Sequence, residues 1–268
     1  MSRRDLAASE FRSPLHEDGW RSLKSFTDAR IALGRAGTSL PTAAHLAFQL
    51  DHARARDAVH LPLDVKGFLD SLAGIGLTPV ELHSRVADRR QYLLRPDLGR
   101  RLAPESAAGL EKLDAPPTDL ALVVADGLSS AAIERQALPF LRAFLGEVGD
   151  RLTLAPTAYV NLGRVAVGDE VGERLNARMA AVLIGERPGL SSPDSMGVYL
   201  TYGPRVGLTD ESRNCISNIR PEGLHPADAA STLHYLVKGA MEKGLSGVRL
   251  KDERELSPAP KVKGISRN

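Results

Sequence analysis

The sequence predicts an α/β fold, with a mostly parallel, Rossmann-like sheet and flanking helices, preceded by a mainly helical N-terminal region. Two observations support this prediction. A Pro-Pro pair at residues 116–117 divides the chain, and only the part after it alternates short apolar runs with helical patterns. Such alternation is typical of parallel strands whose connecting helices pack on the faces of one sheet.

Four parts of the chain are expected. Residues 1–20 are polar and mixed in charge, which is typical of an N-terminal tail. A helical N-terminal region covers residues 21–115, and an α/β domain covers residues 116–250. Residues 251–268 are charged and contain proline, so we expect a C-terminal tail there.

Composition excludes several classes of protein. The 268 residues are 43% hydrophobic and 25% charged, the composition of a soluble globular protein. The net charge of +2 does not indicate a nucleic-acid-binding surface, and no apolar run is long enough to span a membrane. The N-terminus lacks the apolar core of a secretory signal. The one cysteine excludes an internal disulfide and fits a reducing compartment, so the predicted location is the cytoplasm.

The helical N-terminal region shows three start signals. They predict helices at residues 43–57 capped by Thr42, at 64–72 capped by Asp64, and at 80–89 begun by Pro79. His45 and His52 in the first helix lack the i, i+4 spacing of a helical metal site, so they are interpreted as surface histidines.

The α/β region supplies the remaining predicted elements. Extended segments are predicted at residues 119–127, 152–160, 180–184, 198–202 and 248–250, and around Cys215. Helices are predicted from Ser129 or Ser130 to about Leu145, from Val165 or Ala166 onward, and from Pro226 to about Met241.

The stretch 179–221 contains the residues that best fit a binding site. Polar loops there follow buried strands, and ligands of α/β sheets collect beyond the carboxyl ends of strands. Glu186 stands two residues past such an end, where it could act as a general base, an arginine partner or an acceptor for amide donors. Ordinary sheet with polar turns is the alternative interpretation.

Cys215 and a group of arginines leave further alternatives open. Cys215 could be a nucleophile paired with His225, or a small buried apolar residue. The arginines could bind phosphate or carboxylate groups, or pair with carboxylates of a partner chain. They are Arg164, Arg187, Arg205, Arg213 and Arg220.

Long motifs in this stretch carry a family resemblance. They are residues 185–195 (GERPGLSSPDS), 199–202 (YLTY), 205–210 (RVGLTD) and 213–223 (RNCISNIRPEG), with further matches at 29–35 (ARIALGR), 55–60 (ARDAVH) and 124–129 (VADGLS). Together they resemble the small subunit of ethanolamine ammonia-lyase, over residues from about 20 to 250.

The resemblance implies a cofactor and a partner. Enzymes of this family use adenosylcobalamin to convert ethanolamine to acetaldehyde and ammonia. A large subunit, a (β/α)₈ barrel, holds the substrate and the radical chemistry, and the small subunit covers the mouth of that barrel with the corrin between them. Carried over by motif, the cobalamin contacts of this chain are Val165, Glu186 and Cys215. The resemblance assigns it no catalytic residue and no metal ligand.

Two further expectations follow from the resemblance. The chain should be inactive alone and form a hetero-oligomer with the large subunit, either contacting the corrin or serving as a purely structural partner. Relatives that enter bacterial microcompartments often carry a longer N-terminal extension, whereas only about twenty residues precede the matching region here. Free cytoplasm and a microcompartment therefore both stay open as locations.

Overall fold

A computed structural model of the chain describes residues 13–254, which divide into two compact units. The first contains residues 13–57 together with Gly189–Pro193, and the second contains residues 58–188 and 194–254. Residues 1–12 of the predicted N-terminal tail and 255–268 of the predicted C-terminal tail lie outside the described residues. None of the helices in the described part is long and apolar enough to cross a membrane.

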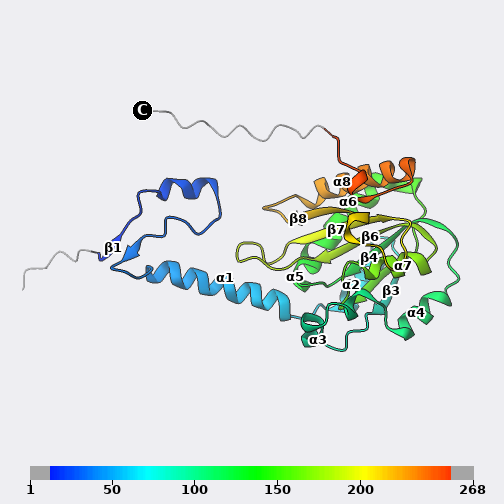
Figure 1. Ribbon diagram of the computed structural model, residues 1–268, viewed down its shortest axis with the longest axis horizontal. Coiled ribbons are helices and arrows are strands. Elements are labelled where there is room, and N and C mark those ends of the chain that lie inside the picture. The colour runs from blue at the N-terminus through cyan, green and yellow to red at the C-terminus, as the bar shows by residue number, and fades with distance from the viewer. Residues whose placement is uncertain (1–12, 255–268) are drawn as a thin grey trace, which may run out of the picture. The chain divides into compact units, whose positions relative to one another are not determined.

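The second unit is built around a six-stranded sheet, and we call it the sheet unit (Figure 1). Its strands, in spatial order, are β3 (Pro79–His83), β5 (Thr157–Asn161), β4 (Thr118–Ala125), β6 (Ala177–Gly185), β7 (Met196–Tyr202) and β8 (Arg213–Ile219). The first four are parallel to one another, whereas β7 is antiparallel to β6 and β8 is antiparallel to β7.

The predicted α/β class is confirmed. The sheet is mixed, so the predicted mostly parallel, Rossmann-like arrangement is not confirmed. The physical reason lies in the connection from β6 to β7. Only residues 186–195 join these strands, and a parallel crossover needs a dozen or more residues, usually with a helix. The short loop therefore returns the chain antiparallel to β6.

Each face of the sheet is covered by its own helices. Leu120, Leu122 and Val124 of β4 point to one core, which α6 (Leu138–Val148) and α8 (Pro226–Lys243) cover together with α2 (Val65–Ala73). The alternate residues of β4 point to the other core, which α4 (Pro104–Glu111) and α7 (Val167–Arg174) cover. The strand is buried on both faces because both sets of side chains are apolar.

Two predicted elements in this unit are wrong. Residues 80–89 do not form a helix, because Pro79–His83 is strand β3 and the next helix is α3 (Arg89–Leu94). Proline is tolerated at the first residue of an edge strand, and Leu82 is buried in the core. The segment predicted as a last strand is the 3₁₀ turn Gly247–Arg249.

A single turn of helix, α5 (Ser130–Ala132), leads through a π turn (Ile133–Ala137) into α6.

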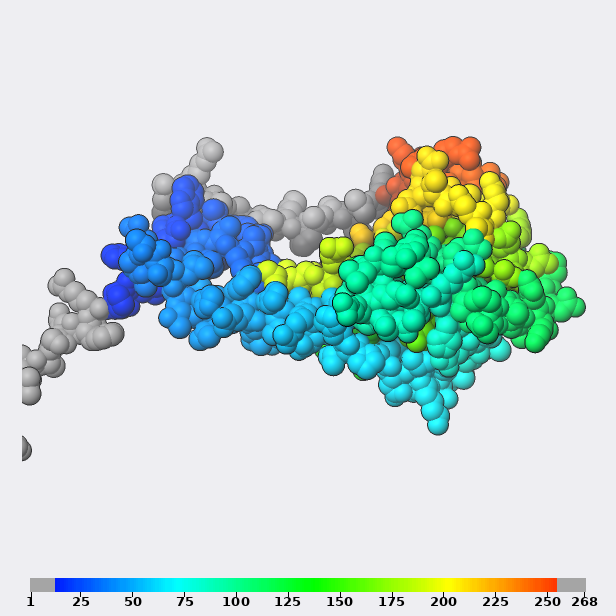
Figure 2. Space-filling model, turned by 60° about the horizontal axis from the view of Figure 1, so that its bottom comes forward, coloured from blue at the N-terminus to red at the C-terminus, as the bar shows by residue number. Residues whose placement is uncertain are grey.

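The first unit consists of a long helix and the segment that lies on it. Helix α1 (Thr42–His60) begins in this unit and includes the predicted helix 43–57. The segment before it contains the strand pair β1 (Leu15–His16) and β2 (Arg35–Ala36) and the 3₁₀ helix Arg21–Phe26. Helix α1 is light blue in the space-filling view, where much of its length is visible (Figure 2).

Candidate functional site

Two of the three predicted cofactor contacts lie at the same edge of the sheet. Strands β5, β4 and β6 are parallel neighbours, so their carboxyl ends meet at one edge. Glu186 directly follows β6, and Val165 lies between the end of β5 and the start of α7. This edge is where α/β sheets bind ligands.

The Glu186 carboxylate is held in place by its neighbours. The Ser195 hydroxyl donates to Oε2 at 2.6 Å, and the backbone N–H of Asn218 lies 3.3 and 3.4 Å from the two oxygens. A Cβ at Gly197 would lie 2.9 Å from Oε1, so this glycine leaves the room that the carboxylate occupies. Because a carboxylate has about four acceptor positions, these contacts leave capacity for further donors.

Cys215 lies on the same side of the sheet as this carboxylate. It pairs with Tyr199 across β7 and β8, and the Tyr199 ring contacts the position where a Gly197 side chain would begin. Cys215 is exposed, so its interpretation as a buried apolar residue is wrong. Glu186, Tyr199 and Cys215 form what we call the open sheet face, beyond the part of this face that packs on α7.

Two groups of the open sheet face, Cys215 and Tyr199, have raised pKa values. Partial desolvation raises the pKa of the Cys215 thiol, the charge of Glu186 raises it further, and a hydrogen bond with Tyr199 acts in the opposite direction. Burial also raises the pKa of Tyr199. His225 caps α8, where its Nδ1 accepts from the Ala227 N–H at 3.3 Å. The pKa of the Cys215 thiol is therefore raised, whereas a nucleophilic cysteine is activated by a lowered pKa.

Val165 borders a cavity of about 580 Å³ next to the mouth of α7. The wall of this cavity includes the buried ion pair of Arg213 and Asp169, whose nitrogen–oxygen distances are 2.8 and 3.1 Å. Burial raises the pKa of Asp169 to about 6, because desolvation outweighs the attraction of Arg213. Val165 itself is half-buried and packs against the core under α7.

The turn that carries Val165 is fixed by an aromatic residue far away in the sequence. The guanidinium carbons of Arg89 and Arg164 lie over the Tyr92 ring, 4.9 and 4.1 Å from its centroid. The Tyr92 hydroxyl donates to the Gly163 carbonyl at 3.2 Å, and Arg164 donates to the Tyr92 carbonyl at 2.9 Å. Burial raises the pKa of Tyr92 to about 12, so it stays a donor.

A buried carboxylate that the sequence prediction missed joins the ends of β4 and β5. Asp126 accepts from the Leu162 N–H at 2.7 Å and lies 3.4 Å from Arg89, which also donates to the Gly127 carbonyl at 2.6 Å. Burial raises the pKa of Asp126 to about 6. The only sequence signal was its position at the end of a strand, since Arg89 lies 37 residues away.

Three of the five arginines singled out from the sequence contact groups of this chain. Arg164 lies on Tyr92, Arg213 pairs with Asp169, and Arg220 donates to Asn218 and lies 3.5 Å from Glu222. These contacts within the chain are a role that neither alternative for the arginines included, because the three side chains help to hold the turns around the candidate site.

The chain is thus an α/β protein with a mixed sheet, whose candidate residues lie at a sheet edge and on an exposed part of one face. Comparison with known families finds a match to the ethanolamine ammonia-lyase light chain over residues 17–251. A curated relative from Azotobacter vinelandii, named ethanolamine ammonia-lyase small subunit, is 58% identical over 250 residues, which cover 92% of this chain and 93% of the relative.

Relatives with the same name come from other bacteria. One from Pseudomonas putida (strain GB-1) is 56% identical over 92% of each chain, and one from Xanthomonas campestris pv. campestris is 56% identical over 89% of each chain. The chain therefore belongs to the ethanolamine ammonia-lyase light chain family, and it is a subunit of a lyase. The resemblance predicted from the motifs is confirmed, whereas the roles of Val165, Glu186 and Cys215 as cofactor contacts stay predictions.

Proposed function

We propose that this chain closes the cobalamin site of an adenosylcobalamin-dependent ethanolamine ammonia-lyase, over a large subunit that carries the substrate and the radical chemistry. The reaction converts ethanolamine to acetaldehyde and ammonia. The observation that carries the proposal is the open sheet face, where an oriented carboxylate, Glu186, lies on the same side as the exposed Cys215.

The residues present fit one side of a corrin. A corrin has an apolar ring and a rim of amide groups. The Glu186 carboxylate has acceptor positions left for amide N–H donors, and Val165 and Cys215 are small enough to pack against a ring edge. Tyr199, half-buried beside Cys215, adds an apolar ring to the same face.

The contribution of this chain is binding and orientation. Bound adenosylcobalamin supplies the radical that starts the rearrangement, and the protein supplies position and environment. Ser195 keeps the Glu186 carboxylate aimed across Gly197, and Tyr92 with Arg164 fixes the turn before Val165. The raised pKa of Cys215 keeps a neutral thiol on this face, so the thiol adds no second negative charge beside Glu186.

The proposal makes the chain inactive by itself and active in a hetero-oligomer with the large subunit, in the cytoplasm or inside a bacterial microcompartment. Co-expression of the two subunits tests this, with ammonia release measured with and without adenosylcobalamin. We expect activity only when both chains and the cofactor are present. Full activity of the large subunit alone would contradict an essential role at the cofactor site.

A further inference from the structure

The first unit has almost no apolar core of its own. Among residues 13–57, only Pro41 is buried. Many of its large apolar side chains are exposed: Leu15, Trp20, Leu23, Phe26, Leu40, Leu46, Phe48 and Leu50. Trp20 is 69% exposed and Leu46 is 57% exposed. A monomeric protein rarely exposes so many large apolar residues within one short segment.

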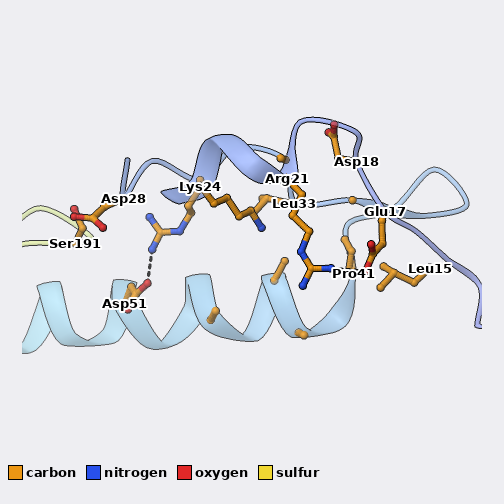
Figure 3. Close-up of a pocket in the computed structure, with 16 residues that line it drawn as sticks. Leu15, Glu17, Asp18, Arg21, Lys24, Asp28, Leu33, Pro41, Asp51 and Ser191 are labelled. Atoms are coloured by element: carbon orange, nitrogen blue, oxygen red, sulfur yellow. Dashed lines mark hydrogen bonds and ion pairs between the residues drawn. The ribbon is translucent and has the colours of Figure 1, made fainter. Parts of the chain in front are cut away.

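Mainly polar contacts hold this unit together. Arg30 pairs with Asp51 of α1 at 2.5 Å, and its guanidinium carbon lies 5.4 Å from the centre of the Phe48 ring. Figure 3 shows the pocket of about 440 Å³ between the N-terminal segment and α1, with charged Arg21 and Lys24 facing the helix. Half-exposed ion pairs contribute little free energy, whereas ordering each residue costs about 1–2 kcal/mol. The unit therefore needs an outside apolar surface to stay ordered.

We propose that this unit is a docking arm, residues 13–57 with Gly189–Pro193, which is buried against an apolar surface of the lyase's large subunit. The inference rests on the proposed function, because that function names the partner. The docking-arm proposal adds to that function by identifying the part of this chain that anchors the complex.

The distribution of apolar residues on α1 favours a larger partner over a second copy of the chain. Successive helix residues turn by about 100°, so Leu46 and Leu50 are about 40° apart while Phe48 lies on the other side of the helix. Two arms paired along one stripe would cover only one of these sides. A larger chain with a groove covers both.

The loop within the arm points to the same partner. Gly189–Pro193 forms the tip of the β6–β7 loop, and Ser191 lines the pocket on α1. The same loop begins after Glu186, the central residue of the proposed cofactor site. The arm is therefore continuous in sequence with the segment that the large subunit meets in the proposed complex.

The test is a pair of matched double variants on α1. Leu46→Ala with Leu50→Ala removes the apolar stripe, and His45→Ala with Gln49→Ala removes exposed polar side chains at the same spacing on the same helix. Alanine has the highest helix propensity, so both variants keep α1. We expect the leucine variant to bind immobilised large subunit at least tenfold more weakly than the wild-type chain does. The polar variant should bind it with an affinity within about threefold of the wild-type value.

Unchanged affinity of the leucine variant would overturn the proposal. Sedimentation of the free chain tests whether a second copy of the chain covers the arm instead. If the wild-type chain self-associates and the leucine variant is monomeric but keeps its affinity for the large subunit, the docking-arm proposal is also wrong. Cobalamin titration of complexes saturated with each variant separates this result from the proposed function. If the leucine variant keeps both its affinity for the large subunit and normal cobalamin binding, only the docking-arm proposal is wrong. If the wild-type chain does not bind the large subunit at all, the proposed function is wrong as well.

Discussion

The sheet unit buries apolar side chains on both faces of β4, whereas the docking arm buries almost none of its own. In the sheet unit, Phe140 and Phe144 of α6 are fully buried and their rings stack 6.3 Å apart. In the arm, Phe48 is 41% exposed and contacts the charged Arg30 and the exposed His52. The sheet unit is stabilised by its own core, whereas the proposed docking arm depends on a partner, although both contain regular secondary structure.

Large-to-small substitutions should give the largest difference between the units. Phe144→Ala should lower the unfolding free energy of the free chain by about 3–5 kcal/mol, because it leaves a cavity in the core between α6 and the sheet. Leu50→Ala in the arm should change it by less than about 0.5 kcal/mol. Urea unfolding measures both, and equal losses at the two positions would show that the arm has a core of its own.

The buried carboxylate of Asp126 should make the stability of the sheet unit depend on pH. The pKa of Asp126 is raised from 3.8 to about 6, so between these values the folded chain holds a proton that the unfolded chain has released. The stability contributed at this site therefore falls as the pH rises from about 4 to about 6, by about 3 kcal/mol in total.

Asp126→Asn removes this titration while keeping an oxygen that accepts from the Leu162 N–H. The difference in unfolding free energy between variant and wild type should shift in favour of the variant by about 3 kcal/mol from pH 4 to pH 7. If the difference in unfolding free energy between Asp126→Asn and the wild type does not change with pH, the pKa of Asp126 is not raised.

The smallest effect is expected at a surface ion pair of the sheet unit. Arg135 lies 2.9 Å from Asp194, and its side chain is 62% exposed. Arg135→Ala should cost less than about 1 kcal/mol of unfolding free energy, and salt should weaken the effect further. A double-mutant cycle with Asp194→Ala measures the pair energy, and a value above about 2 kcal/mol would mean that this contact stabilises the loop after Glu186 more than its exposure indicates.

Local signals account for the elements that the sequence predicted correctly. Asp64 caps α2 by accepting from the Gly67 N–H, and the apolar run of β4 identifies a strand buried on both faces. The elements predicted wrongly depend on contacts distant in sequence. β3 is a strand because it pairs with β5, 78 residues further along the chain. Five residues that begin with proline carry too little pattern to show this.

The candidate site was predictable to a similar extent. The position of Glu186 at the end of a buried strand could be predicted from the apolar run before it. The exposure of Cys215 and its pairing with Tyr199 depend on the register of β7 and β8, which includes an irregularity between Met196 and Val198. The Arg89–Asp126 contact depends on how α3 packs beside the sheet, and no local pattern records it.

Cobalamin titration of the assembled two-subunit complex tests whether the open sheet face contacts the cofactor. Glu186→Ala should leave assembly intact and weaken cobalamin binding by about tenfold or more, since a hydrogen bond to a charged group is worth about 1.5–3 kcal/mol. Glu242→Ala, on an exposed position of α8, should bind cobalamin like the wild type. An intact Glu186→Ala complex with unchanged cobalamin affinity would contradict such a contact and leave this chain as a structural partner of the large subunit.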